Sequence, residues 1–161
     1  MRRSGVILIR LIALAIGALT IERCCILPFL CNRQVRVVQR RTQAAMDYPA
    51  VRAAVVAREN IERMNRVIGG CSTDVNAQLL FAANAKLIGD TQGQFEHLDA
   101  ALKIDQRPEL YYDRGMASLA LGRVDAAVND LATAARFNPT LIEDLSGELR
   151  TRVEHAAHLQ R

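Results

Sequence analysis

The chain has 161 residues and a formal net charge of +4, and half of its residues are hydrophobic although only 4% are aromatic. This length suits one globular domain with a short targeting segment and excludes two large domains. A chain that is half hydrophobic and 24% charged is not a disordered polyelectrolyte. It lacks tryptophan and is rich in alanine, leucine and arginine, so the composition predicts an all-α fold.

Charge is distributed unevenly along the chain. Residues 32–70 carry eight arginines and three acidic side chains, whereas residues 71–161 carry nine basic and thirteen acidic side chains. The basic character therefore belongs to the amino-terminal part and not to the globular body. For this reason we expect no nucleic-acid partner.

Residues 1–31 are predicted to be a signal peptide or a membrane anchor. The apolar stretch Gly5–Ile21 follows Met-Arg-Arg and is broken only by Arg10; its uninterrupted part of eleven residues has the length of a secretory h-region. A second apolar patch, residues 24–31, would extend it towards bilayer length. We favour an uncleaved anchor over a cleaved signal, and a buried helix of the soluble fold is a third alternative. The predicted location is membrane-anchored or exported, at the inner membrane or in the periplasm if the source is bacterial.

Arginines on both sides of the apolar segment leave its topology open. Those that follow it could contact lipid head groups or lie on a solvated helix.

The cysteines and histidines do not form a recognisable site. Three cysteines, Cys24, Cys25 and Cys31, lie in or beside the apolar segment, and Cys71 lies between two predicted helices. This spacing is not that of a zinc site, so we interpret them as small apolar residues at a membrane surface and at a helix junction.

No catalytic motif is found. The sequence contains no serine-nucleophile elbow, zinc-protease motif or phosphate-binding glycine loop. His155 and His158 provide too few ligands for a metal. His97 and Asp99 form the only titratable pair worth testing, and two positions apart on a helix they face different sides. We therefore expect no enzymatic activity, no cofactor and no metal.

The body contains an internal repeat. A shift of 33 to 34 residues aligns Val75–Gln106 with Pro108–Pro139, and it pairs Gly89 with Gly122. In each unit, apolar residues at helical spacing lie on both sides of the glycine. Each unit is therefore predicted to be two helices joined by a glycine turn.

The second unit resembles the tetratricopeptide repeat family. The match includes the segment Pro108-Glu109-Leu110-Tyr111-Tyr112-Asp113-Arg114-Gly115, the turn glycine Gly122, the packing alanines Ala127 and Ala134, and the closing Asn138-Pro139. The first unit departs from the pattern, with Ala82 in place of Gly115, Gln94 in place of Ala127 and Gln106 in place of the proline. The resemblance covers residues 75–139. It implies an all-α, short helical-hairpin repeat solenoid, here with an amino-terminal apolar signal-anchor helix.

Close packing explains the small residues of the pattern. Gly115 and Ala127 must be small where the two helices of a unit meet, Gly122 can end a helix in the left-handed conformation, and Tyr111 fills the gap between hairpins. Two units leave their outer faces uncovered, so both ends of the array need a cap.

Segments on either side of the two repeats, 72–140, can provide these caps. Residues 32–71 are predicted to be linking helices, and a possible degenerate repeat, with a first helix over Gln34–Met46 and a second that begins at Asp47-Tyr48-Pro49 and stops at Gly69-Gly70. Residues 141–161 are predicted to be a carboxy-terminal capping helix that opens with a Thr140/Glu143 capping box. Its apolar stripe comprises Leu141, Ile142, Leu145, Leu149, Val153 and Ala156.

The resemblance implies a function in recognition. Tetratricopeptide arrays present a concave groove that binds segments of partner proteins, and the family's groove positions correspond here to Asn76, Leu79, Ala83, Lys86, Glu109, Tyr112, Met116 and Leu119. We expect a non-catalytic, membrane-tethered scaffold or assembly factor that binds another protein and could form a homodimer. The alternative is an accessory subunit that binds a small or lipid-linked ligand in cell-envelope polymer synthesis or secretion. An open groove favours the first and a closed pocket between repeats favours the second.

Overall fold

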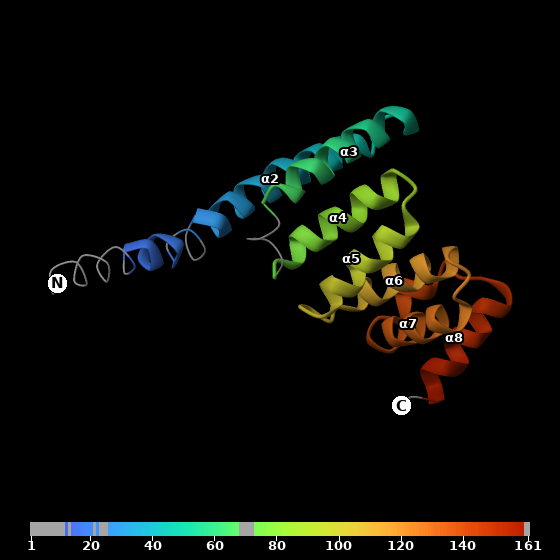
Figure 1. Cartoon of the computed structure of the whole chain (residues 1–161). Coiled ribbons are helices and arrows are strands. Elements are labelled where there is room, and N and C mark those ends of the chain that lie inside the picture. Colours follow the sequence, from blue (N-terminus) through green and yellow to red (C-terminus); the bar gives the residue numbers. More distant parts are fainter. Residues whose placement is uncertain (1–11, 13, 21, 23–25, 68–72, 160–161) are drawn as a thin grey trace, which may run out of the picture.

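The computed structural model describes residues 12, 14–20, 22, 26–67 and 73–159, and these residues form helices joined by short turns, without a strand (Figure 1). The prediction of an all-α fold is confirmed. Helical hairpins follow one another in chain order and stack side by side, from α2 and α3 at one end to α8 at the other.

The first hairpin consists of α2, Leu27–Ala45, and α3, Ala50–Asn65. Proline lies in the first turn of α2, where its missing N–H costs nothing, and Pro49 is the N-cap of α3. The sequence predicted a first helix that begins at Gln34. The helix instead begins seven residues earlier, and Cys31 in this added part is buried in the core that α2 forms with α3 and α4. The predicted stop at Gly69-Gly70 lies outside the described residues.

The next two hairpins share one design. The second hairpin is formed by α4, Val75–Leu87, and α5, Thr91–Leu102; the third by α6, Pro108–Ala120, and α7, Val124–Phe137. Each turn contains a glycine with positive φ, Gly89 at 78° and Gly122 at 73°, a conformation that costs glycine little. The two helix–turn–helix units predicted from the internal repeat are thus confirmed.

Stacking follows a regular order. The second helix of each hairpin packs on the first helix of the next, α3 on α4 and α5 on α6, while α7 packs on α8. α2 also contacts α4. The buried residues form three clusters along the stack: one between the first hairpin and α4, one around α5 and α6, and one between α7 and α8. The end helices therefore cover apolar faces that the two repeats alone would expose.

The carboxy-terminal cap begins differently from the prediction. Pro139–Ile142 form a short 3-10 helix, η3, and α8 spans Gly147–Leu159. Asn138 Oδ1 accepts hydrogen bonds from the backbone N–H and the hydroxyl of Thr140 at 3.2 and 2.7 Å, so Asn138 caps η3 and Thr140 lies inside it. The predicted Thr140/Glu143 capping box is wrong for this reason. Three residues of the predicted stripe, Ile142, Leu145 and Val153, are nevertheless buried in the cluster with α7, and Leu149 and Ala156 pack against it. Ala157, which was not predicted, is buried there as well.

The amino-terminal prediction concerns residues that are mostly not described. Ile12 and residues 14–20 are helical. Within the described part of the chain, no helix combines the length and apolar character required to cross a bilayer. The other residues of the apolar stretch Gly5–Ile21 lie outside the described residues.

Gly115 lies where α6 packs tightly against α7. A Cβ at this position would lie 2.9 Å from Leu131 Cγ and 3.3 Å from the carbonyl oxygen of Ala127, so Leu131 would have to move within a packed core. Overpacking typically costs about 1–3 kcal/mol, and alanine regains about 1 kcal/mol of helix propensity. We therefore expect Gly115→Ala to lower the free energy of unfolding by about 1–2 kcal/mol in urea titrations. In the double variant Gly115→Ala, Leu131→Ala the two costs should be less than additive, and full additivity would contradict the contact.

Candidate functional site

Two neighbouring hollows mark the candidate binding surface. The larger, of about 530 Å³, lies where the turn between α2 and α3 meets the end of α4. Its lining is mainly apolar and comprises Ala45, Met46, Tyr48, Ala50, Ala53, Ala83, Lys86 and Leu87. Three successive helices thus contribute to one apolar concavity.

The second hollow, of about 290 Å³, lies between the turn that joins α4 to α5 and the end of α6. It is lined by Lys86, Thr91, Gln94, Met116, Ala117 and Ala120. Lys86 borders both hollows, and both open to solvent. We call this combined surface the Lys86 groove. It runs past the carboxy-terminal ends of α2, α4 and α6.

The groove contains three of the eight predicted site residues, Ala83, Lys86 and Met116. Asn76 and Glu109 are exposed in the first turns of α4 and α6, and at 1.5 Å per residue Asn76 lies about 15 Å along the helix axis from Lys86. The remaining three are partly buried in the core: Leu79 packs against the cluster around α5 and α6, whereas Tyr112 and Leu119 pack against the cluster between α7 and α8.

Residues of the first hairpin were missed. Met46, Tyr48 and Ala50 line the larger hollow, but residues 32–71 carry no repeat signature from which groove positions could be assigned. Thr91 and Gln94 were missed because they belong to α5, a second helix of a hairpin. The Tyr48-Pro49 break between two apolar helices is the signal that could have placed Tyr48 at a hairpin end.

The groove carries charges of both signs. Lys86 lies in its centre, close to Asp113 on α6. Burial raises the pKa of Asp113, the positive charge of Lys86 opposes this rise, and the carboxylate of Glu109 adds to it. The side chain of Asp113 is still open to water. On the first hairpin, the Arg52 guanidinium lies 4.2 Å from the ring centre of Tyr48 and orients that ring. Charged side chains thus lie beside the apolar residues that line the groove.

His97 and Asp99 point to different partners. The His97 ring stacks on Phe81 with ring centres 4.6 Å apart, and its Nδ1 lies 2.9 Å from Oε1 of Gln78. Asp99 accepts a hydrogen bond from Nη1 of Arg114 at 2.6 Å and pairs with Lys103 at 2.7 Å. The structure does not bring the two side chains together as an acid–base pair, and each stabilises a helix contact.

The environment of His97 predicts a pH dependence of stability. Burial lowers its pKa, and the opposing charges of Glu96 and Asp90 are weaker influences. Because the folded pKa lies below the value of about 6.5 for an unfolded chain, the unfolded state takes up protons first. The His97 contribution is complete above about pH 6.5 and decreases as the pH falls below that value. In urea titrations from about pH 7.5 to about pH 5, His97→Gln should reduce the slope. His155→Gln, at an exposed position on α8, is the control, and an equal change in both variants would contradict this origin.

The interpretation of Cys31 as a small apolar residue at a membrane surface is wrong. Its side chain is 2% exposed and disulfide-bonded, and its Sγ lies 4.0 Å from Oδ2 of Asp74 at the start of α4. The other three cysteines lie outside the described residues. Among the residues that the structure describes, no group of three or more histidine, cysteine or acidic side chains is arranged to hold a metal ion.

Comparison of the chain with models of known protein families, with curated proteins and with solved structures gave no match.

Proposed function

We propose that the protein is a non-catalytic interaction module, similar to tetratricopeptide repeat proteins, which binds a segment of another protein in the Lys86 groove. The observation that carries this proposal is a mainly apolar concavity, open to solvent, built by the ends of α2, α4 and α6 from successive hairpins. Apolar anchors in such grooves provide most of the binding energy of peptide segments.

The charges of the groove restrict its occupant. An apolar side chain suits the floor formed by Met46, Ala83 and Leu87, and an acidic group beside it suits Lys86. The carboxylate of Asp113, close to Lys86, disfavours further acidic groups over α6. We propose a segment with one or two apolar anchors, one carboxylate and a basic residue on the α6 side.

The membrane tether and the exported location belong to the same proposal. The apolar stretch Gly5–Ile21 supports an anchor, and the disulfide of Cys31 supports an oxidising compartment, because structural disulfides are rare in the cytosol. The protein is then a membrane-tethered scaffold or assembly factor whose body faces the oxidising side.

One observation favours the alternative, an accessory subunit for a small or lipid-linked ligand. The larger hollow, at about 530 Å³, is within the usual range of small-molecule pockets. This hollow is open on one side, however, so a bound polypeptide segment can continue from it into the second hollow. The open side therefore favours a protein partner over a small ligand.

Matched variants on one hairpin test the groove. Met116 on α6 and Val124 on α7 are exposed to similar extents, 38% and 41%, but only Met116 lines the groove. A photo-crosslinking side chain at position 116, in the membrane-bound chain, should form a protein crosslink that is absent at position 124. The charge substitution Met116→Lys should abolish capture by a crosslinker placed at Met46, while Val124→Lys should not.

Crosslinks to the same proteins from positions 116 and 124, or capture that survives Met116→Lys, would contradict the groove as the binding site. Crosslinks to a small or lipid-linked molecule would support the alternative, and crosslinks to a second copy of the chain would identify a homodimer. Tyr112 is a poor test position, since it packs against the α7–α8 cluster and its truncation would disturb the fold.

A further inference from the structure

α2 has two faces of opposite character. Its inner face is buried against α3 and α4 and consists of Cys31, Val35, Val38, Thr42 and Ala45. Most positions between them are exposed and form an outer face along the length of the helix, whereas Gln34 and Arg41 are partly buried. Because the inner face is packed and hydrogen-bonded, the outer face has a fixed orientation relative to the rest of the stack.

The outer face changes from apolar to basic along the helix. At its start Ile26, Phe29 and Leu30 are exposed, and Phe29 is 64% exposed. Arg33, Arg36 and Arg40 then follow at helical spacing, without an acidic residue anywhere in α2. None of these three arginines forms an ion pair within the described part of the chain, whereas Arg41, near the inner side, pairs with Glu59.

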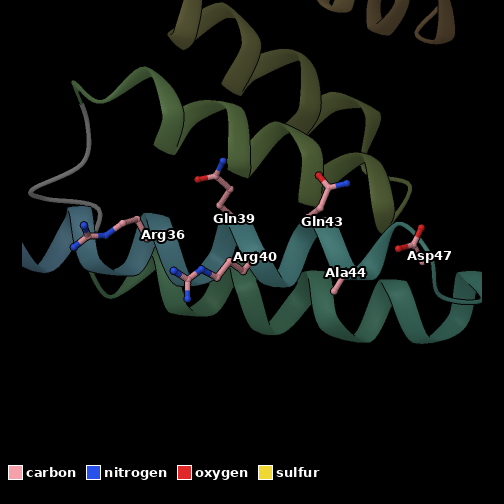
Figure 2. Close-up of a pocket in the computed structure, with 6 residues that line it drawn as sticks. All are labelled: Arg36, Gln39, Arg40, Gln43, Ala44 and Asp47. Carbon is pink, nitrogen blue, oxygen red and sulfur yellow. The ribbon is translucent and has the colours of Figure 1, made fainter.

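A hollow of about 640 Å³ lies on this basic face (Figure 2). It is lined by Arg36, Gln39, Arg40, Gln43, Ala44 and Asp47, all from one side of α2 and the turn that follows. Two guanidinium groups and two side-chain amides supply hydrogen-bond donors, which is the chemistry that recognises phosphate oxygens. Asp47 closes the far end with the only negative charge.

We propose that the outer face of α2 docks on the surface of a bilayer that contains anionic phospholipids. The exposed apolar side chains of the first turn enter the head-group region, and Arg33, Arg36 and Arg40 contact lipid phosphates, as amphipathic basic helices do at membrane interfaces. The chain before α2 continues the apolar character, since Ile12, Leu14, Ile16 and Leu19 are also exposed.

Two observations favour a lipid surface over a nucleic acid. A nucleic-acid backbone gives no site for the exposed Ile26, Phe29 and Leu30, whereas a membrane interface does. The body from residue 71 onwards has thirteen acidic and nine basic side chains, which repel any polyanion that extends beyond α2. The same repulsion keeps the body away from an anionic bilayer, so that only the outer face of α2 makes contact.

The docking would orient the groove. α2 is rigidly packed on α3 and α4, and the Lys86 groove includes the end of α2, so contact with lipid sets the height and direction of the groove above the membrane. The inference extends the membrane tether of the proposed function and does not depend on what the groove binds.

Vesicle flotation of the full chain tests the proposal. The comparison uses vesicles of phosphatidylcholine alone and vesicles with about a third phosphatidylglycerol, at low and high salt. The test variant replaces Arg33, Arg36 and Arg40 by glutamine. The control variant makes the same replacement at three other exposed arginines, Arg58 and Arg63 of α3 and Arg66 at its C-cap, so that the change in net charge is equal. We expect the wild type and the control to prefer anionic vesicles by about tenfold or more, and the test variant to lose most of this preference.

The outcomes separate the docking surface from the tether. Binding to neutral vesicles reports the tether alone. A preference for anionic vesicles that the test variant retains, or that both variants lose equally, would overturn the role of α2. Binding of an RNA oligonucleotide through the same three arginines, without a vesicle preference, would also overturn it. Circular dichroism on both variants should give the wild-type helical content, since all six arginines are exposed.

Discussion

Replacement of Arg114 by methionine is expected to lower the free energy of unfolding by about 2–3 kcal/mol. Arg114 Nε and Nη2 donate to the two carboxylate oxygens of Asp130 at 2.8 and 2.7 Å, and Nη1 donates to Asp99. One guanidinium on α6 thus joins α5 and α7. The substitution leaves the Asp130 side chain, which is 12% exposed, without its bidentate partner. Chemical denaturation followed by circular dichroism measures the loss.

Two further variants show whether the unpaired carboxylate causes the loss. In Arg114→Met, Asp130→Leu the stranded charge is removed, and much of the stability should return because an apolar pair can replace a buried ion pair. Arg150→Met breaks a pair in which both partners are nearly half exposed, and it should cost less than about 0.5 kcal/mol. A double variant no more stable than Arg114→Met would show that Asp130 is not the source of the cost.

The sequence predicted the two central hairpins because their signals are local. A glycine turn, a small residue at the helix contact and apolar residues at helical spacing act within one unit, and Gly89, Gly115 and Gly122 have the predicted roles. Contacts between units were less predictable. The Arg114 bridge depends on which residues of three neighbouring helices meet, and one copy of the sequence gives no such pairing.

The candidate site was predicted only in part for the same reason. The family pattern identifies positions on the first helix of each hairpin, and it located Ala83, Lys86 and Met116 in the groove. It assigned Tyr112 and Leu119 to the groove as well. Because α8 packs on this end of the stack, these two side chains instead pack against the cluster between α7 and α8. The end helices, whose sequences lack the repeat pattern, therefore decide which positions stay open to a partner.

The first hairpin is joined to the second through a buried polar cluster of Thr42, Asn60 and Asn84, one residue from each of α2, α3 and α4. The amide of Asn60 donates to Thr42 Oγ1 and Asn84 Oδ1 at 3.2 and 3.0 Å. The amide of Asn84 donates to Thr42 Oγ1 at 2.9 Å and to the Leu80 carbonyl at 2.7 Å. All three side chains are at most 2% exposed, so each needs the others to satisfy its hydrogen-bonding groups.

Asn84→Ala is expected to lower the free energy of unfolding by about 3 kcal/mol, because it removes one of the two acceptors of the Asn60 amide and a hydrogen-bond partner of Thr42, and it leaves a cavity. In a stacked array each hairpin contacts only its neighbours, so the loss should be concentrated in the first hairpin. Hydrogen exchange measured by mass spectrometry should accelerate in α2 and α3 and stay near wild type in α6 and α7. Asn76→Ala, an exposed position on the same helix, should change neither. Uniform acceleration along the chain would instead show that the hairpins unfold as one unit, and it would contradict a loss confined to the first hairpin.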